Sequence, residues 1–248
     1  MKSALRKTLL SLITLLLMIG VASVDMVKAD LVLYLSFDEG SGNKVKDSAQ
    51  GYTTSLAGDT NWIEGKVNKA LEFKGNAKVE IDRTDVLEPK TEITIATWLK
   101  LNDNTGNHEI VRKQIPNGKG YDIRLQSGKI HWWVNVGGWQ NSNSPENLPV
   151  NEWMFLSTTY DGSKSRIYLN GEEIASNDIA GKIIYDESNL LIGSAAPHDP
   201  NYNLNGALDE FMMWNKTMSP AEIEAAIKDI SPVELKEKLP VLWGALKR

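Results

Sequence analysis

The chain has 248 residues, 42% of them hydrophobic, and a formal net charge of −5 at pH 7. Its acidic character argues against nucleic acids and anionic membranes as partners, because both are negatively charged. The sequence has no cysteine, which excludes disulfides and thiolate chemistry, so stability must come from a core that a chain of this length can bury in one domain.

The first 29 residues have the pattern of a secretory signal peptide. A basic start precedes an apolar run over residues 9–24, and small residues place a cleavage point before Asp30. The alternative is an uncleaved anchor helix, but the run is shorter than the roughly 20 apolar residues of a membrane span, and Asp25 and Lys28 end it. We therefore predict that residues 1–29 are a signal peptide and that the mature chain is secreted, extracellular or periplasmic, without a membrane span.

From Asp30 onwards the chain shows the alternation of a β protein. Residues 30–37 (DLVLYLSF) predict a strand that runs into a polar, glycine-rich turn. Ser127-Gly128 and Asn170-Gly171 predict two-residue hairpin turns. Further strands are predicted at the short spacing of an all-β domain, over 77–81, 92–101, 109–113, 121–125, 129–136, 153–160, 165–169, 173–175 and 189–193.

The stretch from residue 206 onwards predicts the last strand of the fold. Strict alternation would place Asp209, Phe211 and Met213 on one face, which we expect to point into the core. Glu210 would then lie on the opposite face, solvated or in a salt bridge.

A short helix is predicted directly after this strand. Ser219 and Glu222 form the S-x-x-E capping box of a helix start, and apolar residues repeat at helical spacing from Ile223 to Ile230. The tail over residues 231–248 is too apolar for a solvated segment. We expect it to pack back on the domain; the alternative is a peptide presented to a partner.

Several blocks of the sequence resemble the LamG-like jelly-roll family of the concanavalin A-like lectin/glucanase superfamily. The closing block GALDEFMMWNKTMSPAEI is similar to the family pattern G-x-I-D-E-V-x-I-W-N-R-A-L-S-x-x-E-I. The blocks that begin at Phe37 (FDEGSG), at Trp62 (W-x-x-G-K) and at Trp153 (WMFLSTTYDGSKSRIYLNG) match earlier family patterns. Asn68 stands where the family usually has glycine.

This resemblance covers nearly all of residues 30–229. It implies an all-β fold, a two-sheet antiparallel jelly-roll β-sandwich with one short C-terminal helix, as a single LamG-like domain over residues 30–230. A fold of this kind hosts many activities, so function must be argued from sites.

The sequence offers no convincing catalytic pattern. Retaining glucanases of the superfamily carry E-x-D-x-E or E-x-D-x-x-E on one strand, which places two carboxylates about 5 Å apart. The nearest string is Glu80 to Asp85 (EIDRTD), and its third acid would fall across a turn on an early strand. The three histidines are too scattered for a metalloenzyme motif. We predict that the chain is not an enzyme.

A calcium site is the main cofactor prediction. A carboxylate at Asp209 that faces the core must be paired, hydrogen-bonded or bound to a cation. The family resemblance implies a structural Ca²⁺ where the acidic turn after the first strand meets the last strand. That carries over to Asp38 and Asp209, with a backbone carbonyl near Gly75. The alternative is that Asp209 caps a turn through hydrogen bonds.

Aromatic residues give the candidate ligand site. On the predicted strand 129–136, His131, Trp133 and Asn135 face away from the core, and Trp139 follows in a polar loop. Tyr202 lies in a second polar loop. Flat rings beside polar side chains suit a sugar, whose CH face stacks while its hydroxyls form hydrogen bonds. The alternative is that the two tryptophans are buried under loops.

Without residues 1–29 the chain keeps 23 basic and 31 acidic residues, a net charge of about −8, which is compatible with neutral glycans or cations as ligands. The sequence therefore favours a secreted, non-catalytic glycan-binding module with a structural calcium. An extracellular protein-interaction or adhesion module is the alternative, and a glycoside hydrolase is a weaker one.

Overall fold

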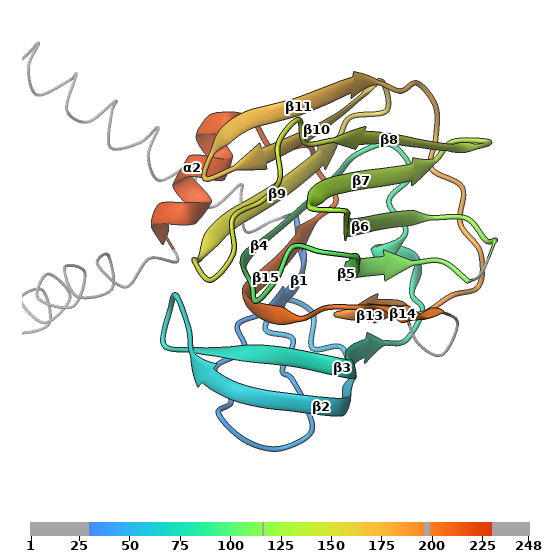
Figure 1. The fold of residues 1–248 in the computed structure, drawn as a ribbon. Helices are drawn as coiled ribbons and strands as arrows, with labels where there is room; N and C mark the ends of the chain where they lie inside the picture. Colours follow the sequence, from blue (N-terminus) through green and yellow to red (C-terminus); the bar gives the residue numbers. More distant parts are fainter. Residues whose placement is uncertain (1–29, 116, 196–198, 230–248) are drawn as a thin grey trace, which may run out of the picture.

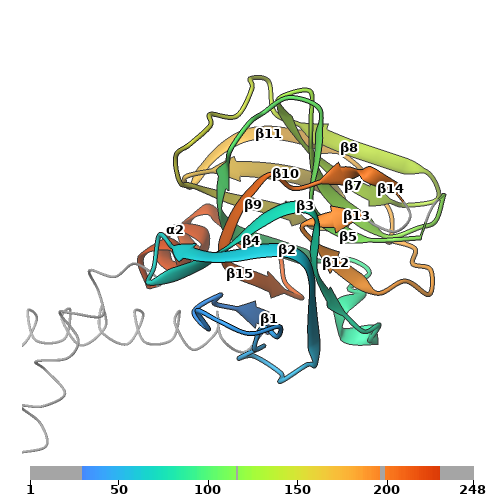
Figure 2. The same ribbon diagram turned by 60° about the horizontal axis from the view of Figure 1, so that its bottom comes forward.

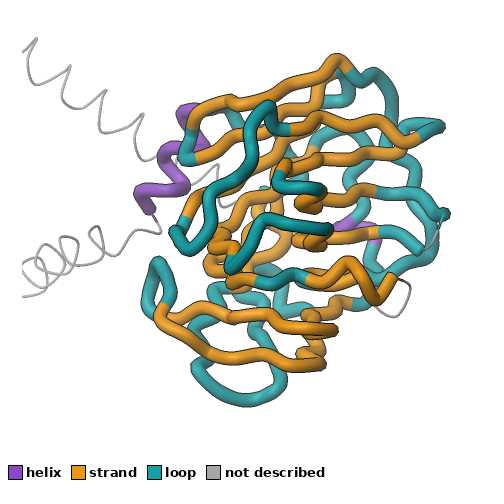
Figure 3. Tube along the Cα trace, viewed as in Figure 1, coloured by secondary structure: helices purple, strands orange, loops and turns teal. Residues whose placement is uncertain are grey.

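The structure is a computed structural model that describes residues 30–115, 117–195 and 199–229. The predicted signal peptide at 1–29 and the tail at 231–248 lie outside the described residues. In the described part the chain is built almost entirely of strands, with one α-helix at its C-terminal end and one short 3₁₀ helix (Figure 3).

The first half of the chain forms β1 (Leu31–Leu35), β2 (Thr54–Glu64), β3 (Lys69–Ile81), η1 (Asp85–Leu87), β4 (Ile93–Leu101), β5 (Asn107–Lys113), β6 (Tyr121–Gln126) and β7 (Lys129–Asn135). The second half forms β8 (Trp139–Asn143), β9 (Met154–Tyr160), β10 (Lys164–Leu169), β11 (Glu172–Asp178), β12 (Leu190–Ile192), β13 (Ser194–Ala195), β14 (Asp199–Asn203), β15 (Gly206–Trp214) and α2 (Pro220–Asp229).

One large antiparallel sheet bends round on itself to make two layers (Figures 1 and 2). Its strand order is β11-β10-β9-β4-β15-β3-β12-β5-β6-β7-β8, with β1 added to β15 and β2 added to β3. The sheet nearly closes, because β8 returns beside β10 and β11, where Asn177 Nδ2 donates to the Asn141 carbonyl at 2.9 Å. The predicted all-β, antiparallel sandwich with a short C-terminal helix is confirmed.

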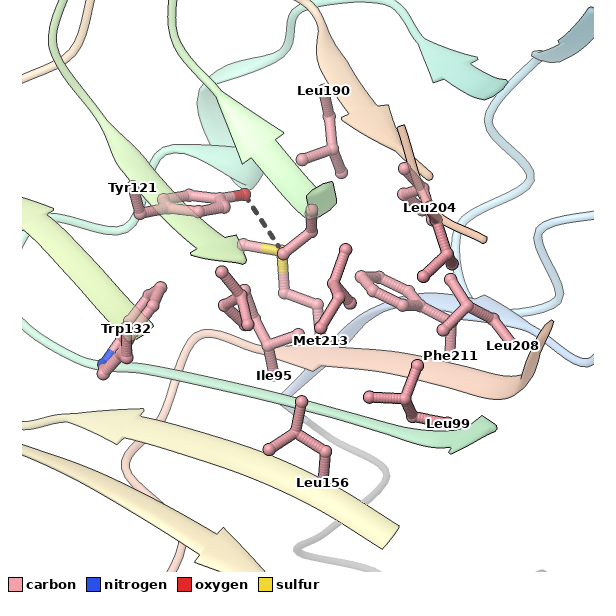
Figure 4. Close-up of a cluster of buried hydrophobic side chains, with 14 of the residues drawn as sticks. Ile95, Leu99, Tyr121, Trp132, Leu156, Leu190, Leu204, Leu208, Phe211 and Met213 are labelled. Atoms are coloured by element: carbon pink, nitrogen blue, oxygen red, sulfur yellow. Dashed lines mark hydrogen bonds between the residues drawn. The ribbon is translucent and has the colours of Figure 1, made fainter. Parts of the chain in front are cut away.

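The core fills the space between the two layers (Figure 4). Ile95 and Leu156 from β4 and β9 face Tyr121 and Trp132 from β6 and β7, with Met213 between them. The buried polar atoms of these rings have partners, as such atoms require. The indole N–H of Trp132 donates to the Thr159 carbonyl at 3.1 Å, and the Tyr121 hydroxyl contacts Met213 Sδ at 3.5 Å.

Local turn and cap chemistry agrees with the sequence. The first residues of the two predicted hairpin turns, Ser127 and Asn170, have φ values of +51° and +53°, as a type I′ turn requires. Glu222 Oε2 accepts from both the backbone N–H and the hydroxyl of Ser219 at 2.8 Å, which completes the capping box. No helix in the described part of the chain combines the length and apolarity of a membrane span.

The alternation predicted for the last strand is wrong at one point. A β-bulge interrupts the pairing of β15 with β4. Two residues of β15, Glu210 and Phe211, lie opposite a single residue of β4. Glu210 has φ of +52°, a left-handed conformation that reverses the alternation. Leu208 therefore joins Met213 in the core, and Asp209 points outward, beside Trp98 on β4.

Candidate functional site

The candidate ligand site is a single outer face of strands β7 and β8. In β7 the core receives Ile130, Trp132 and Val134, so the alternate residues point outward. Trp133 pairs with Asn141, and Asn135 pairs with Trp139. Paired residues share a face, so Trp133 and Trp139 occupy diagonal positions on it, which are about 7–8 Å apart in antiparallel sheets.

The structure therefore brings Trp133, Trp139 and His131 together, and we call this surface, with Asn141, the indole face. Trp139 was expected in a loop, but it begins strand β8 instead. Within the described residues the Trp139 ring stacks on no other ring, and its side chain is half-buried. This ring is the part of the face most open to a ligand.

His131 is a neutral hydrogen-bonding group on this face. Its ring lies nearly parallel to that of Trp133, at 13° and 6.1 Å between centroids. Asn141 Nδ2 donates to His131 Nδ1 at 2.9 Å, so the ring proton belongs on Nε2. Burial, followed by the positive charges of Arg124 and Lys129, lowers the pKa of His131 and keeps it uncharged at neutral pH.

Asn135 and Tyr202 occupy the margins of the indole face. Asn135 is buried, and its Oδ1 accepts the N–H of Gly137 at 3.2 Å, so it shapes the turn between β7 and β8. Tyr202 was expected in a loop but lies in β14, where its half-buried ring faces the Arg124 guanidinium at 5.5 Å. The same guanidinium lies 5.4 Å from the Trp133 ring centroid.

Two cross-strand rows connect the indole face to a buried charged cluster on the same side of the sheet. The register aligns one row as Arg112, Asp122, Trp133 and Asn141, and the other as Glu109, Arg124, His131 and Asn143. Glu109 and Asp122 are fully buried. Each has a guanidinium beside it, with Arg124 Nε 3.2 Å from Asp122 Oδ1 and Arg112 Nη1 3.6 Å from Glu109 Oε2.

Burial makes both carboxyl groups of this cluster harder to ionise. Burial raises the pKa of Glu109 well above its usual range, and the neighbouring charge of Asp122 adds to the effect. Burial also raises the pKa of Asp122, although Arg124 and Arg112 oppose it. Gln114 Nε2 donates to Asp122 Oδ2 at 2.9 Å, whereas both oxygens of Glu109 are buried without a hydrogen-bond partner in the described residues.

This carboxyl pair lacks the geometry of a glycosidase. Retaining hydrolysis needs two carboxyl groups that contact the substrate, and both Glu109 and Asp122 are fully buried. The other acidic string also has a structural role, since Glu80 accepts from Lys78 Nζ at 2.8 Å and from Asn189 Nδ2 at 2.9 Å.

The predicted calcium ligands are brought together only in part. Asp38 accepts from the backbone N–H of Lys69 at 3.0 Å and from Asn68 Nδ2 at 3.1 Å. Asp209 Oδ2 accepts from the N–H of Val67 at 2.8 Å. Both carboxylates thus lie on the turn between β2 and β3. Asn68 has φ of +46° there, a conformation that asparagine tolerates in place of the family's glycine.

Gly75 is not part of this cluster. It is exposed and lies six residues along β3 from Lys69, which is about 20 Å at about 3.3 Å per residue. Glu210, expected on the opposite, solvated face, is instead buried near Asp209, and its carboxylate accepts a hydrogen bond from the Tyr34 hydroxyl. The bulge in β15 explains this difference, because it turns both acids to one side.

This second acidic cluster is electrostatically unfavourable when ionised. Burial, with the charges of Glu210 and Asp38, raises the pKa of Asp209 to about 8. Burial and the charge of Asp38 raise the pKa of Glu210 to about 7, although the Tyr34 hydrogen bond lowers it. No three His, Cys, Asp or Glu side chains in the described residues are arranged to hold a metal ion.

The fold is that of a concanavalin-like, LamG-type binding domain. Residues 73–224 match the Laminin_G_3 family model, described as the concanavalin A-like lectin/glucanases superfamily, so the chain belongs to that family. The resemblance predicted from the sequence motifs is confirmed.

Curated relatives match over small parts of much longer proteins. Pappalysin-1 of Mus musculus is 27% identical over 215 residues, which is 73% of this chain and 12% of that protein. Adhesion G-protein coupled receptor D1 of Homo sapiens is 36% identical over 90 residues, 34% of this chain and 10% of the receptor. The chain thus spans about a tenth of the length of these relatives.

Solved structures show the same fold in binding domains. The binding domain of Paraclostridial Mosquitocidal Protein 1 has a TM-score of 0.66 and 19% identity, covering 81% of this chain and 52% of that one. Domain 4 of AbnA, a GH43 extracellular arabinanase from Geobacillus stearothermophilus, in complex with arabinotriose, has a TM-score of 0.63 and 16% identity. It covers 82% of this chain and 98% of that domain.

Proposed function

We propose that this chain is a secreted, non-catalytic module that binds a glycan on the indole face. The observation that carries the proposal is the pairing of β7 with β8, which sets Trp133 and Trp139 side by side on one surface. An indole offers a flat apolar surface to the CH face of a sugar. His131 Nε2 and the amide of Asn141 lie beside it to bond hydroxyl groups.

The comparisons support a glycan without identifying one. A domain of the same fold is known in complex with arabinotriose, and it belongs to an extracellular enzyme. Export of the present chain is supported by the signal-peptide pattern of residues 1–29. The absence of separated carboxylates on the indole face favours binding over hydrolysis.

We also propose a structural Ca²⁺ at the β2–β3 turn, held by Asp38 and Asp209 without Gly75. Asp209 Oδ1 is buried and accepts no hydrogen bond, and hard carboxylate oxygens are the ligands that Ca²⁺ prefers. When bound, the ion would neutralise the repulsion among Asp38, Asp209 and Glu210 and join the first strand to the last. The competing explanation is that Asp209 serves the turn alone, through its hydrogen bond to Val67.

Retention of the purified protein by a broad panel of immobilised polysaccharides tests the function, with Ca²⁺ and with chelator. We expect retention by at least one glycan, and loss of retention in Trp139→Ala. The matched control is Trp153→Ala, since Trp153 is also half-buried but packs in the cluster under α2. If the protein is still retained by the glycan in chelator, calcium is not needed for glycan contact, and any bound calcium has a structural role. A blank panel would contradict the proposal and favour the protein-partner alternative, for which the botulinum neurotoxin DC binding domain in complex with rat synaptotagmin II is a structural precedent of the fold.

A further inference from the structure

Arg124 presents unused hydrogen-bond donors at the edge of the indole face. Its Nε lies 3.2 Å from Asp122 Oδ1. Its guanidinium lies 5.4 Å from the ring centroid of Trp133 and 5.5 Å from that of Tyr202. The side chain is 20% exposed. None of the side chains that the structure describes forms a hydrogen bond to its two Nη groups. The planar, positively charged guanidinium therefore has free N–H donors at the indole face.

The charged cluster beneath Arg124 does not neutralise it. Two guanidiniums, Arg112 and Arg124, face two carboxyl groups, Glu109 and Asp122. Burial raises the pKa of Glu109 well above its usual range and favours its neutral form, so the two guanidiniums face at most one carboxylate. Arg124 is the most exposed of the four side chains, so the surplus positive charge is available to an anion there.

A neighbouring group on the indole face is a donor too. The neutral His131 carries its proton on Nε2, because its Nδ1 accepts from Asn141. Carboxylate and sulfate groups only accept hydrogen bonds, so they complement a surface of donors. A neutral hydroxyl group complements it less well, because its own O–H also needs an acceptor.

We propose that Arg124 makes the indole face selective for acidic glycans, whose carboxylate or sulfate groups bind the Arg124 guanidinium while the sugar ring packs against the indoles. This inference rests on the proposed function, whose ligand class it narrows. The net negative charge of the whole chain does not oppose it, because charges beyond about 10 Å are screened at physiological salt and the contact is local.

Matched pairs of polysaccharides that differ in the acidic group test the inference. Methyl-esterified polygalacturonate is compared with polygalacturonate, and dextran with dextran sulfate, by measuring dissociation constants for the purified protein. We expect one acidic member to bind about ten- to a hundredfold more tightly than its neutral partner, the range of a charged hydrogen bond. The pair that responds separates a carboxylate ligand from a sulfate ligand.

Three variants test whether the preference for acidic glycans depends on Arg124. Arg124→Gln should abolish the acidic preference but leave neutral binding, and Arg124→Lys should keep part of it, since lysine keeps the charge without the planar fork. Glu109→Gln is the control, because it replaces a buried carboxyl of the pair with a neutral group and should keep the preference. Melting curves show that each variant is folded.

Two results would overturn the inference in distinguishable ways. If neutral glycans bind as tightly as their acidic partners, and Arg124→Gln changes neither, Arg124 has no role in selectivity while the glycan-binding function stands. If the protein binds no acidic or neutral polysaccharide, the proposed function fails and the inference fails with it.

Discussion

Asp122 on β6 and Trp133 on β7 are directly paired across the two strands, so a fully buried carboxyl group lies beside the indole of the candidate ligand site. Arg124 contacts both residues. A change in the charge of the buried cluster should therefore shift Arg124 and, with it, the ring of Trp133. The stability of the cluster and the shape of the ligand site should therefore change together.

Replacing Asp122 with Ala should destabilise the protein strongly. Its loss leaves Arg124 without its carboxylate partner, and breaking a buried ion pair from one side costs about 3–5 kcal/mol. Glu109→Gln should cost much less, because burial raises the pKa of Glu109 well above its usual range and favours the neutral form, which glutamine resembles. Urea unfolding of both variants measures the difference in the free energy of unfolding; equal losses would show that the two carboxyl groups are equivalent.

The Asp209–Glu210 pair should make stability depend on pH in the absence of calcium. Asp209 has a pKa of 3.8 in the unfolded chain and about 8 in the folded protein. Between these values the folded state binds more protons than the unfolded state, so stability falls as pH rises from about 4 to about 8. Glu210, with values of 4.5 and about 7, acts in the same direction.

Melting temperatures in chelator from pH 4 to pH 9 should therefore decline, and Asp209→Asn should flatten the decline. Added Ca²⁺ would favour the ionised carboxylates and raise the melting temperature most at pH 8. A wild-type profile that is level between pH 5 and pH 8 in chelator would contradict the raised pKa values. A profile that responds to pH but not to Ca²⁺ would leave Asp209 as a turn-capping residue.

Gly65→Ala should disrupt the β2–β3 turn. A Cβ at this position would lie 2.5 Å from the Lys69 carbonyl oxygen and 2.6 Å from Asp209 Oδ2, and the carbonyl belongs to the backbone and cannot move away cheaply. We expect a loss of about 1–3 kcal/mol in urea unfolding. Gly138→Ala is the control for the cost of replacing a glycine alone, because it has no positive φ and an added Cβ there would meet nothing within 4 Å.

The cap of α2 gives a smaller, local prediction. Ser219→Ala removes the hydroxyl that bonds the Glu222 carboxylate and backbone N–H, which should cost about 1 kcal/mol of stability. Thermal unfolding measures it, with Thr at the same position as the conservative control. No change in Ser219→Ala would mean that packing of Ile223 and Ala226 against the outer cluster holds the helix without the cap.

The fold and its local turns were predictable because their signals are local. The capping box at Ser219 and the hairpin turns at Ser127 and Asn170 depend on a few adjacent residues, and the family motifs implied the jelly-roll sandwich. The orientation of Asp209 was mispredicted because a bulge leaves no mark on hydrophobic alternation. The evidence for the bulge is the φ of +52° at Glu210, which only the backbone conformation reveals.

The candidate site was half predictable. Trp133, Trp139 and His131 stood out as aromatic or polar residues that alternate with core positions, and the strand register brings them together. Arg124 and Asp122 alternate with core residues in the same way, but in the sequence that pattern is typical of a solvated strand face. Their burial follows from the pairing of β6 with β5 and β7 and from the approach of Tyr202, which periodicity does not show.

The most direct test of the account is the affinity of wild type, Trp139→Ala and Trp153→Ala for the glycan that the panel identifies, measured by isothermal titration calorimetry on folded protein. We predict that Trp139→Ala weakens binding at least about tenfold, as expected when a ring that buries apolar ligand surface is lost, and that Trp153→Ala binds like wild type. Equal affinities for all three proteins would contradict the assignment of the indole face as the binding site.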